Sequence, residues 1–134
     1  MSLFRWGSEH EIYLPEIDAE HRGLFLAGEE LHRALAAGAT AERLKEALHN
    51  LLQLAEAHFL HEERLMRDSG FASYEWHRRQ HDSVRRRAKE LAAADRLSVT
   101  AALDFLASWL RDHTAVADRI MAAHVRNWSR RKAA

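Results

Sequence analysis

The chain has 134 residues, and its 20 lysine and arginine residues balance 20 aspartate and glutamate residues, so the formal net charge is zero. This balance argues against binding of nucleic acid or of an acidic membrane through bulk charge. With 47% hydrophobic residues, 30% charged residues and no cysteine, the chain has the composition of one folded domain without disulfides or thiolate metal sites.

Residues 1–16 contain the only proline and scattered aromatic residues, which predicts an extended arm with turns. Its first residues lack the apolar core of a signal peptide, and no later run is apolar enough to span a membrane, so we expect a cytoplasmic protein. The apolar side chains of the arm are expected to pack over one end of the folded core; they are Leu3, Phe4, Trp6, Ile12 and Tyr13.

Four stretches beyond the arm carry apolar residues at helical spacing. They predict helices over about 18–37, 41–68, 74–94 and 99–123. Asp18, Thr40 and Ser98 are the expected N-terminal caps, and Gly70 is an expected stop. The basic tail from Arg126 is expected to fray. Four amphipathic helices with short connections favour an all-α fold, an antiparallel up-down-up-down four-helix bundle formed by a single domain over 1–134.

Histidine and carboxylate side chains occupy positions in these apolar stripes where leucine or alanine would be expected. The inward set is His21, His58, Glu62, His77, His81 and His113. His58 and Glu62 are four residues apart and therefore share one helix face. A single buried histidine is usually satisfied by a backbone carbonyl, but five unpaired imidazoles would cost more free energy than a small domain has. Metal coordination removes that cost, because imidazole and carboxylate are good ligands of divalent first-row metals.

Five histidines and one carboxylate exceed what one ion needs once water or substrate has a place, so the set predicts two metal ions. Two close cations usually need bridging anions; Glu62 can supply one, and a second carboxylate is expected near His113. Asp112 and Asp118 are the candidates, and on an ideal helix they point about 100° and about 140° away from His113. A π-bulge would bring Asp118 into line. Helical spacing alone leaves this choice open.

Ligand-type residues occur in segments 17–21, 58–63 and 109–113, at His77 and His81, and at Asp118. Together these segments resemble the hemerythrin family, and specifically its bacterial branch, over nearly the whole chain. The resemblance implies two iron ions (Fe2+/Fe3+) with an oxo or hydroxo bridge. It also implies the following ligand set: His77, His81 and His113 on one iron, His21 and His58 on the other, and Glu62 and Asp118 bridging both.

On this resemblance one iron has six ligands and the other has five, so O2 is expected at the iron held by His21 and His58. The family's apolar oxygen pocket corresponds here to Leu24, Phe59, Trp109 and Leu110. Thr114 departs from the family, which usually has a branched aliphatic residue there. Its hydroxyl could hydrogen-bond a ligand or admit water, so we expect faster spontaneous oxidation than in Thr114→Ile.

The resemblance therefore implies reversible O2 binding for carriage, storage or delivery, and not catalysis. From the balanced charge and the lack of a long apolar run we expect neither a nucleic-acid partner nor a membrane span, and we expect a monomer. One alternative is a di-iron redox enzyme acting on O2, peroxide or nitric oxide, and another is a sensing domain that acts through a separate partner. Five nitrogen ligands against two carboxylates favour binding, because carboxylate-rich sites better stabilise high-valent iron. His61 and Glu63 match no ligand position and are expected to be bystanders, although His61 could contact a ligand.

Overall fold

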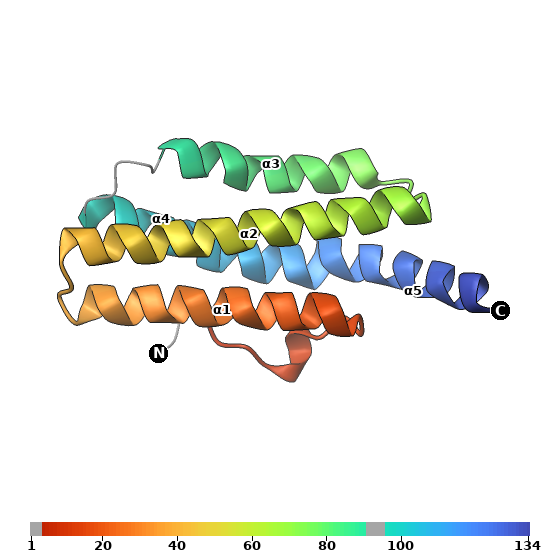
Figure 1. Cartoon of the computed structure of the whole chain (residues 1–134), viewed down its shortest axis with the longest axis horizontal. Coiled ribbons are helices and arrows are strands. Elements are labelled where there is room, and N and C mark those ends of the chain that lie inside the picture. Colours follow the sequence, from red (N-terminus) through yellow and green to blue (C-terminus); the bar gives the residue numbers. More distant parts are fainter. Residues whose placement is uncertain (1–3, 91–95) are drawn as a thin grey trace.

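The computed structural model describes residues 4–90 and 96–134. Its helices form an antiparallel up-down-up-down bundle, in which the last column joins α4, a π-helical turn η2 and α5 end to end (Figure 1). The elements are η1 (Ser8–His10), α1 (Pro15–Ala36), α2 (Ala41–Ser69), α3 (Tyr74–Glu90), α4 (Arg96–His113), η2 (Thr114–Asp118) and α5 (Arg119–Ala133). The all-α four-helix fold expected from the apolar spacing is confirmed. Within the described residues, no helix has the length and apolar character to cross a membrane.

The ends of α1 and α2 show which local signals decide where a helix begins and stops. Thr40 caps α2 as expected, because its hydroxyl accepts a hydrogen bond from the backbone N–H of Arg43 at 3.2 Å. Gly70 ends α2 in the left-handed conformation, with φ of 67°. The predicted cap at Asp18 is wrong, because α1 already begins at Pro15, whose fixed φ suits the first turn of a helix.

The fourth column is longer than its apolar pattern predicted. It begins at Arg96, so Ser98 lies inside the helix and is not its cap. It also continues to Ala133, so the expectation of a frayed tail from Arg126 is wrong. The physical reason is that α5 buries apolar residues up to Val125, and Arg126 donates a hydrogen bond to the backbone carbonyl of Ile12. Residues 91–94 of the predicted third helix lie outside the described residues.

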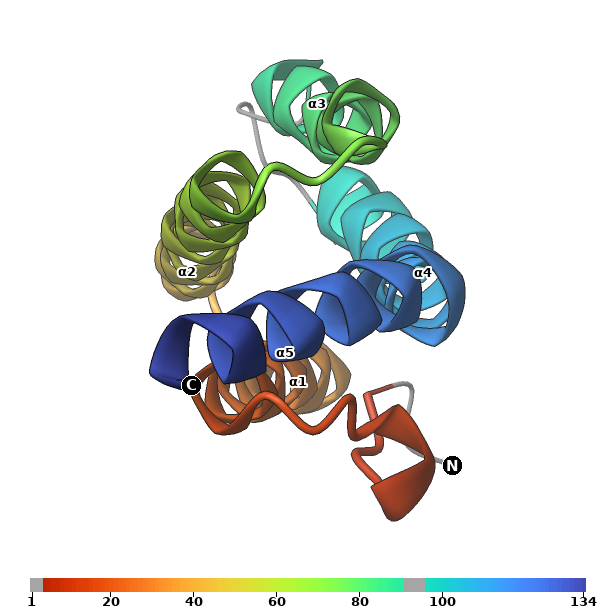
Figure 2. The same ribbon diagram turned by 90° about the vertical axis from the view of Figure 1, so that its right-hand side faces the viewer.

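The N-terminal arm lies along α1, on the side of the bundle away from α3 (Figures 1 and 2). Phe4 and Ile12 are buried as expected, and Trp6 is half-buried. Tyr13 was expected to pack but is 67% exposed, because its positive φ of 61° turns the chain there. The buried carboxylate of Asp18 accepts a hydrogen bond from the backbone N–H of Ile12 at 3.0 Å, which ties the arm to α1.

Two glycines inside α1 have opposite surroundings, and we expect opposite effects when each is replaced by alanine. A Cβ on Gly23 would meet nothing within 4 Å, whereas a Cβ on Gly28 would lie 2.5 Å from Cδ1 of Phe4. Gly23→Ala should raise the free energy of unfolding by about 0.5–1 kcal/mol, because alanine is the better helix former. Gly28→Ala should lower it by about 1–3 kcal/mol through overpacking. Urea unfolding of the two variants measures both changes, and a shift in the same direction would contradict the expectation.

The apolar core is divided into a large cluster and two smaller ones. The large cluster fills one half of the bundle and includes Leu31, Leu51, Phe59 and Leu103. The smaller clusters are centred on Met66 with Met121 and on Ile12 with Ile17. Along α2, the polar residue Glu62 falls between Phe59 of the large cluster and Met66 of a smaller one. The inward polar set therefore lies in an apolar interior.

Candidate metal centre

Seven histidine and acidic side chains meet inside the bundle, and each is at most 4% exposed. They are His21 on α1, His58 and Glu62 on α2, His77 and His81 on α3, His113 at the end of α4 and Asp118 at the end of η2. They form two groups in which ligand atoms lie within 4.8 Å of one another, one with three histidines and one with two. Glu62 and Asp118 belong to both groups.

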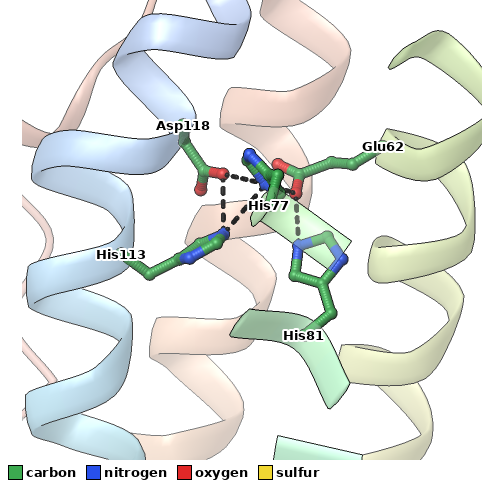
Figure 3. A group of neighbouring side chains, drawn as sticks. All are labelled: Glu62, His77, His81, His113 and Asp118. Carbon is green, nitrogen blue, oxygen red and sulfur yellow. Dashed lines mark hydrogen bonds and ion pairs between the residues drawn. The ribbon is translucent and has the colours of Figure 1, made fainter. Parts of the chain in front are cut away.

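The three-histidine group (His77, His81 and His113) presents its Nε2 atoms to one oxygen of each carboxylate (Figure 3). Oε1 of Glu62 lies 3.0 Å from His81 Nε2 and 3.3 Å from His77 Nε2. Oδ1 of Asp118 lies 2.9 Å from His113 Nε2 and 3.1 Å from His77 Nε2. All of these nitrogens and oxygens therefore point to one common centre.

The two-histidine group (His21 and His58) faces the other oxygen of each carboxylate. Oδ2 of Asp118 lies 3.0 Å from His21 Nε2. Oε2 of Glu62 lies 3.2 Å from His58 Nε2 and 3.6 Å from His21 Nε2. Each carboxylate thus divides its two oxygens between the two groups, which is the arrangement of a carboxylate that bridges two cations.

The π-helical turn η2 brings Asp118 into this position. A π-helix has more residues in each turn than an α-helix, so it reduces the angle between residues five apart, such as His113 and Asp118. Asp118 is 1% exposed, whereas the side chain of Asp112 is 76% exposed. The structure therefore contains the π-helical turn that Asp118 requires and places Asp118, not Asp112, with the histidines.

The donor set fits metal ions. Among the described residues, Oε2 of Glu62, both oxygens of Asp118 and Nε2 of His21 are buried atoms without a hydrogen-bond partner. Buried polar atoms are normally satisfied, so these need a partner of another kind. Imidazole nitrogens and carboxylate oxygens together suit divalent first-row transition metals.

Comparison with known proteins agrees with this chemistry. The family model for the hemerythrin HHE cation binding domain matches residues 14–125, which include all seven side chains. This chain belongs to the hemerythrin family. It is 28% identical over 125 residues to a bacteriohemerythrin of Clostridium acetobutylicum, an alignment that covers 87% of this chain and 97% of that protein. It is also 28% identical over 78 residues to a myohemerythrin of Theromyzon tessulatum, covering 58% of this chain and 59% of that protein. These similarities support the bacterial branch of the family.

Three histidines of this hemerythrin are oriented by side chains outside the expected ligand set. Nδ1 of His58 donates to Glu20, Nδ1 of His81 to Glu63 and Nδ1 of His113 to Gln80, each at 2.7 Å. A proton fixed on Nδ1 leaves the Nε2 lone pair free to face a metal ion.

The expectation that Glu63 is a bystander is wrong, because this residue is buried against His81. His61 contacts the site indirectly, since its Nδ1 donates to Glu20 at 2.6 Å. The only sequence signal for Glu20, Glu63 and Gln80 is that each of them directly adjoins a member of the inward set.

Removing Glu63 should weaken metal binding, because its carboxylate orients His81. We expect Glu63→Ala to lower metal affinity about 10–100-fold, the usual effect of losing such a partner. Glu56→Ala is the matched control, because Arg85 pairs with Glu56 at 2.8 Å and with Glu63 at 2.9 Å, but only Glu63 reaches a histidine of the site. Titration with iron against a competing chelator measures both affinities. Equal affinities in the two variants would contradict a positioning role for Glu63.

Burial and the neighbouring carboxylates act in opposite directions on the pKa values of these histidines. Burial disfavours the charged form of His21, but the nearby Asp118 and Glu62 outweigh it and raise its pKa to about 9. At His58, burial is outweighed by Glu62, Glu20 and Asp118, which raise its pKa to about 10. At His77, Asp118 and Glu62 outweigh burial and raise the pKa to about 9. Despite burial, the histidines hold the carboxyl pKa values of Glu62 and Asp118 well below their usual range. Metal ions and protons therefore compete for the same imidazole nitrogens.

The side chains expected to form the oxygen pocket lie around the cluster but on different sides. Phe59 stacks on His81 and Trp109 on His113, each with ring centroids 4.2 Å apart, so both rings face the three-histidine group. Leu24, Phe59, Leu110 and Thr114 are buried, and Trp109 is half-buried. Among the described residues, the hydroxyl of Thr114 has no hydrogen-bond partner.

Proposed function

We propose that this hemerythrin binds O2 reversibly at two iron ions bridged by Glu62, Asp118 and a solvent-derived oxo or hydroxo group. The observation that carries the proposal is the division of each carboxylate's two oxygens between the two histidine groups. One ion would be held by His77, His81 and His113. The other would be held by His21 and His58 and would have one protein ligand fewer, which leaves room for an external ligand.

The iron ions would supply the electrons and the open coordination position that O2 binding requires. The protein supplies orientation and exclusion of water. Glu20, Glu63 and Gln80 fix the ring orientation of three histidines, and the apolar clusters on either side of the site keep it buried. A buried site with little access to water favours release of O2 unchanged over its reduction.

We propose binding rather than catalysis, because the ligand set has five imidazoles and two carboxylates. Use in carriage, storage or delivery of O2 agrees with this chemistry. The balanced charge of the chain agrees with O2 as its ligand and with the absence of a nucleic-acid partner. A monomeric state and a cytoplasmic location stay predictions.

The proposal is tested by exposing the diferrous protein to O2 and following its visible absorption spectrum. We expect a charge-transfer band that appears with O2 and disappears when the solution is purged with argon. Irreversible bleaching, with turnover of added peroxide or nitric oxide, would instead favour the enzyme interpretation. A protein that takes up no iron under anaerobic loading would contradict the proposal, because O2 binding requires the iron centre.

The hydroxyl of Thr114 should shorten the time for which the iron stays reduced in air. Thr114 is 1% exposed and adjoins His113, and a buried hydroxyl without a partner can hold a water molecule near the metals. We expect Thr114→Val, which keeps the side-chain shape, to oxidise spontaneously several-fold more slowly, as we expect of Thr114→Ile. The rate of ferric absorption gain after exposure to O2 measures the difference. Equal oxidation rates in the unchanged protein, Thr114→Val and Thr114→Ile would show that the hydroxyl of Thr114 does not affect oxidation.

A further inference from the structure

We propose that O2 reaches the two-histidine half of the centre through a groove between α1 and α2, with Leu24 as its gate; the inference rests on the function proposed above. The groove has a volume of about 370 Å³. Ala19, Gly23 and Leu24 line it from α1, and Leu54, Ala57 and His58 line it from α2. It is open to solvent, and Leu54 at its edge is 42% exposed.

The groove lies beside the two-histidine group, which is the first reason to infer that O2 passes through it. Its floor is formed by Leu24 and His58, which are 2% and 4% exposed. His58 belongs to the group with four donor residues, not to the group with five. The groove therefore approaches the centre on the side where an external ligand has room to bind, because one of its lining residues, His58, is itself a donor of that group.

The small size of the lining residues is a second reason to infer that O2 passes through this groove. Gly23 lies inside α1, where glycine weakens a helix, yet no neighbouring atom lies within 4 Å of a Cβ built there and its φ is not positive. Neither backbone conformation nor close packing therefore requires glycine at this position. With alanine at positions 19 and 57, it keeps the side chains along the approach to Leu24 small.

The polarity of the lining indicates what passes through it. Five of the seven lining residues are glycine, alanine or leucine, which favours a small neutral molecule over an ion. Glu20 is the only acidic residue of the lining, and its carboxylate is engaged by the Nδ1 atoms of His58 and His61. A dissolved diatomic gas fits this surface. Passage from the groove to the donor atoms would require the buried side chain of Leu24 to move aside.

Filling the groove separates a route from a binding site, because blocking a route slows binding and release equally and leaves the equilibrium unchanged. We expect Gly23→Leu to lower both the association and the dissociation rate constants for O2 roughly tenfold, with the same Kd. Gly23→Ala is the matched control, because its methyl group leaves the groove open, and it should keep both rates. Ala57→Leu fills the groove from α2 and repeats the test if Gly23→Leu does not fold. Stopped-flow mixing of the diferrous proteins with O2 and with an O2 scavenger gives the two rate constants.

A second measurement does not depend on the reaction with O2. Crystals of the iron-loaded protein pressurised with xenon should show a xenon atom against Gly23 and Ala57, and the Gly23→Leu variant should lose it. Unchanged O2 rates in both filled variants would overturn the route, as would a change in Kd or an absence of xenon from the groove. A protein that holds two irons but fails to bind O2 would overturn the proposed function, while the xenon result would still decide whether the groove admits a gas.

Discussion

Replacing Asp118 with alanine is expected to lower the affinity for metal by more than about 100-fold, beyond the range for residues that only orient a ligand. The carboxylate of Asp118 faces His21 with one oxygen and both His77 and His113 with the other. Its loss would therefore remove a ligand from each of the two proposed metal ions. Asp112→Ala should leave metal binding unchanged, because Asp112 is exposed to solvent. Iron content per chain after gel filtration measures both effects.

The aspartate pair also tests the role of the π-helical turn. Asp112 and Asp118 are six positions apart, and the two side chains are chemically identical, so a difference between their variants reports position alone. Asp118→Asn keeps the size of the side chain and guards against a simple failure to fold. If Asp112→Ala lost iron while Asp118→Asn kept two ions per chain, the bridge would have been assigned to the wrong residue.

The second large effect concerns pH: we expect the folding stability of the metal-free protein to fall as the pH rises, and the affinity for metal to increase. In the metal-free chain the pKa values of His21, His58 and His77 rise from 6.5 to about 9, about 10 and about 9. Groups with raised pKa values stabilise the folded state fully below pH 6.5, and this stabilisation is lost as the pH rises through 9 to 10. We expect the metal-free protein to lose on the order of several kcal/mol of stability across that range.

Metal affinity should change in the other direction. Each ion must displace protons from these imidazoles, so affinity rises with pH over the same range and metal binding near pH 7 releases protons. Urea unfolding of the metal-free protein and chelator competition of the loaded protein, both from pH 6 to 10, test the two signs. His49→Ala removes an exposed histidine outside the cluster. It should leave the pH dependence of stability and that of metal affinity unchanged. A metal-free protein that gained stability between pH 7 and 9 would contradict the raised pKa values of these histidines.

Features set by helical periodicity could be predicted from the sequence. The spacing of apolar residues predicted the four helical columns, and the histidines within the apolar stripes predicted the inward set. Both predictions need only helical periodicity, because residues on one helix face lie close together whatever the detailed packing. The choice between Asp112 and Asp118 depended on a local change of helix type. Spacing on an ideal helix left that choice open, whereas the structure shows the π-turn that decides it.

Features that depend on contacts between columns were harder to predict. Glu20, Glu63 and Gln80 reach histidines on other helices, so their roles depend on the relative rotation and height of two helices. The helical continuation beyond Arg126 depends on the arm, which accepts a hydrogen bond from that residue. Tyr13 was misplaced because a positive φ at a residue other than glycine has no clear sequence signal.

The central claim is that seven side chains hold two iron ions in two unequal groups. An anomalous difference map recorded at the iron absorption edge, from crystals of the iron-loaded protein, tests it most directly. We expect two peaks of equal height, one bonded to Nε2 of His77, His81 and His113 and the other to Nε2 of His21 and His58, with Glu62 and Asp118 bonded to both. A single peak, or two peaks that do not share these carboxylates, would contradict it.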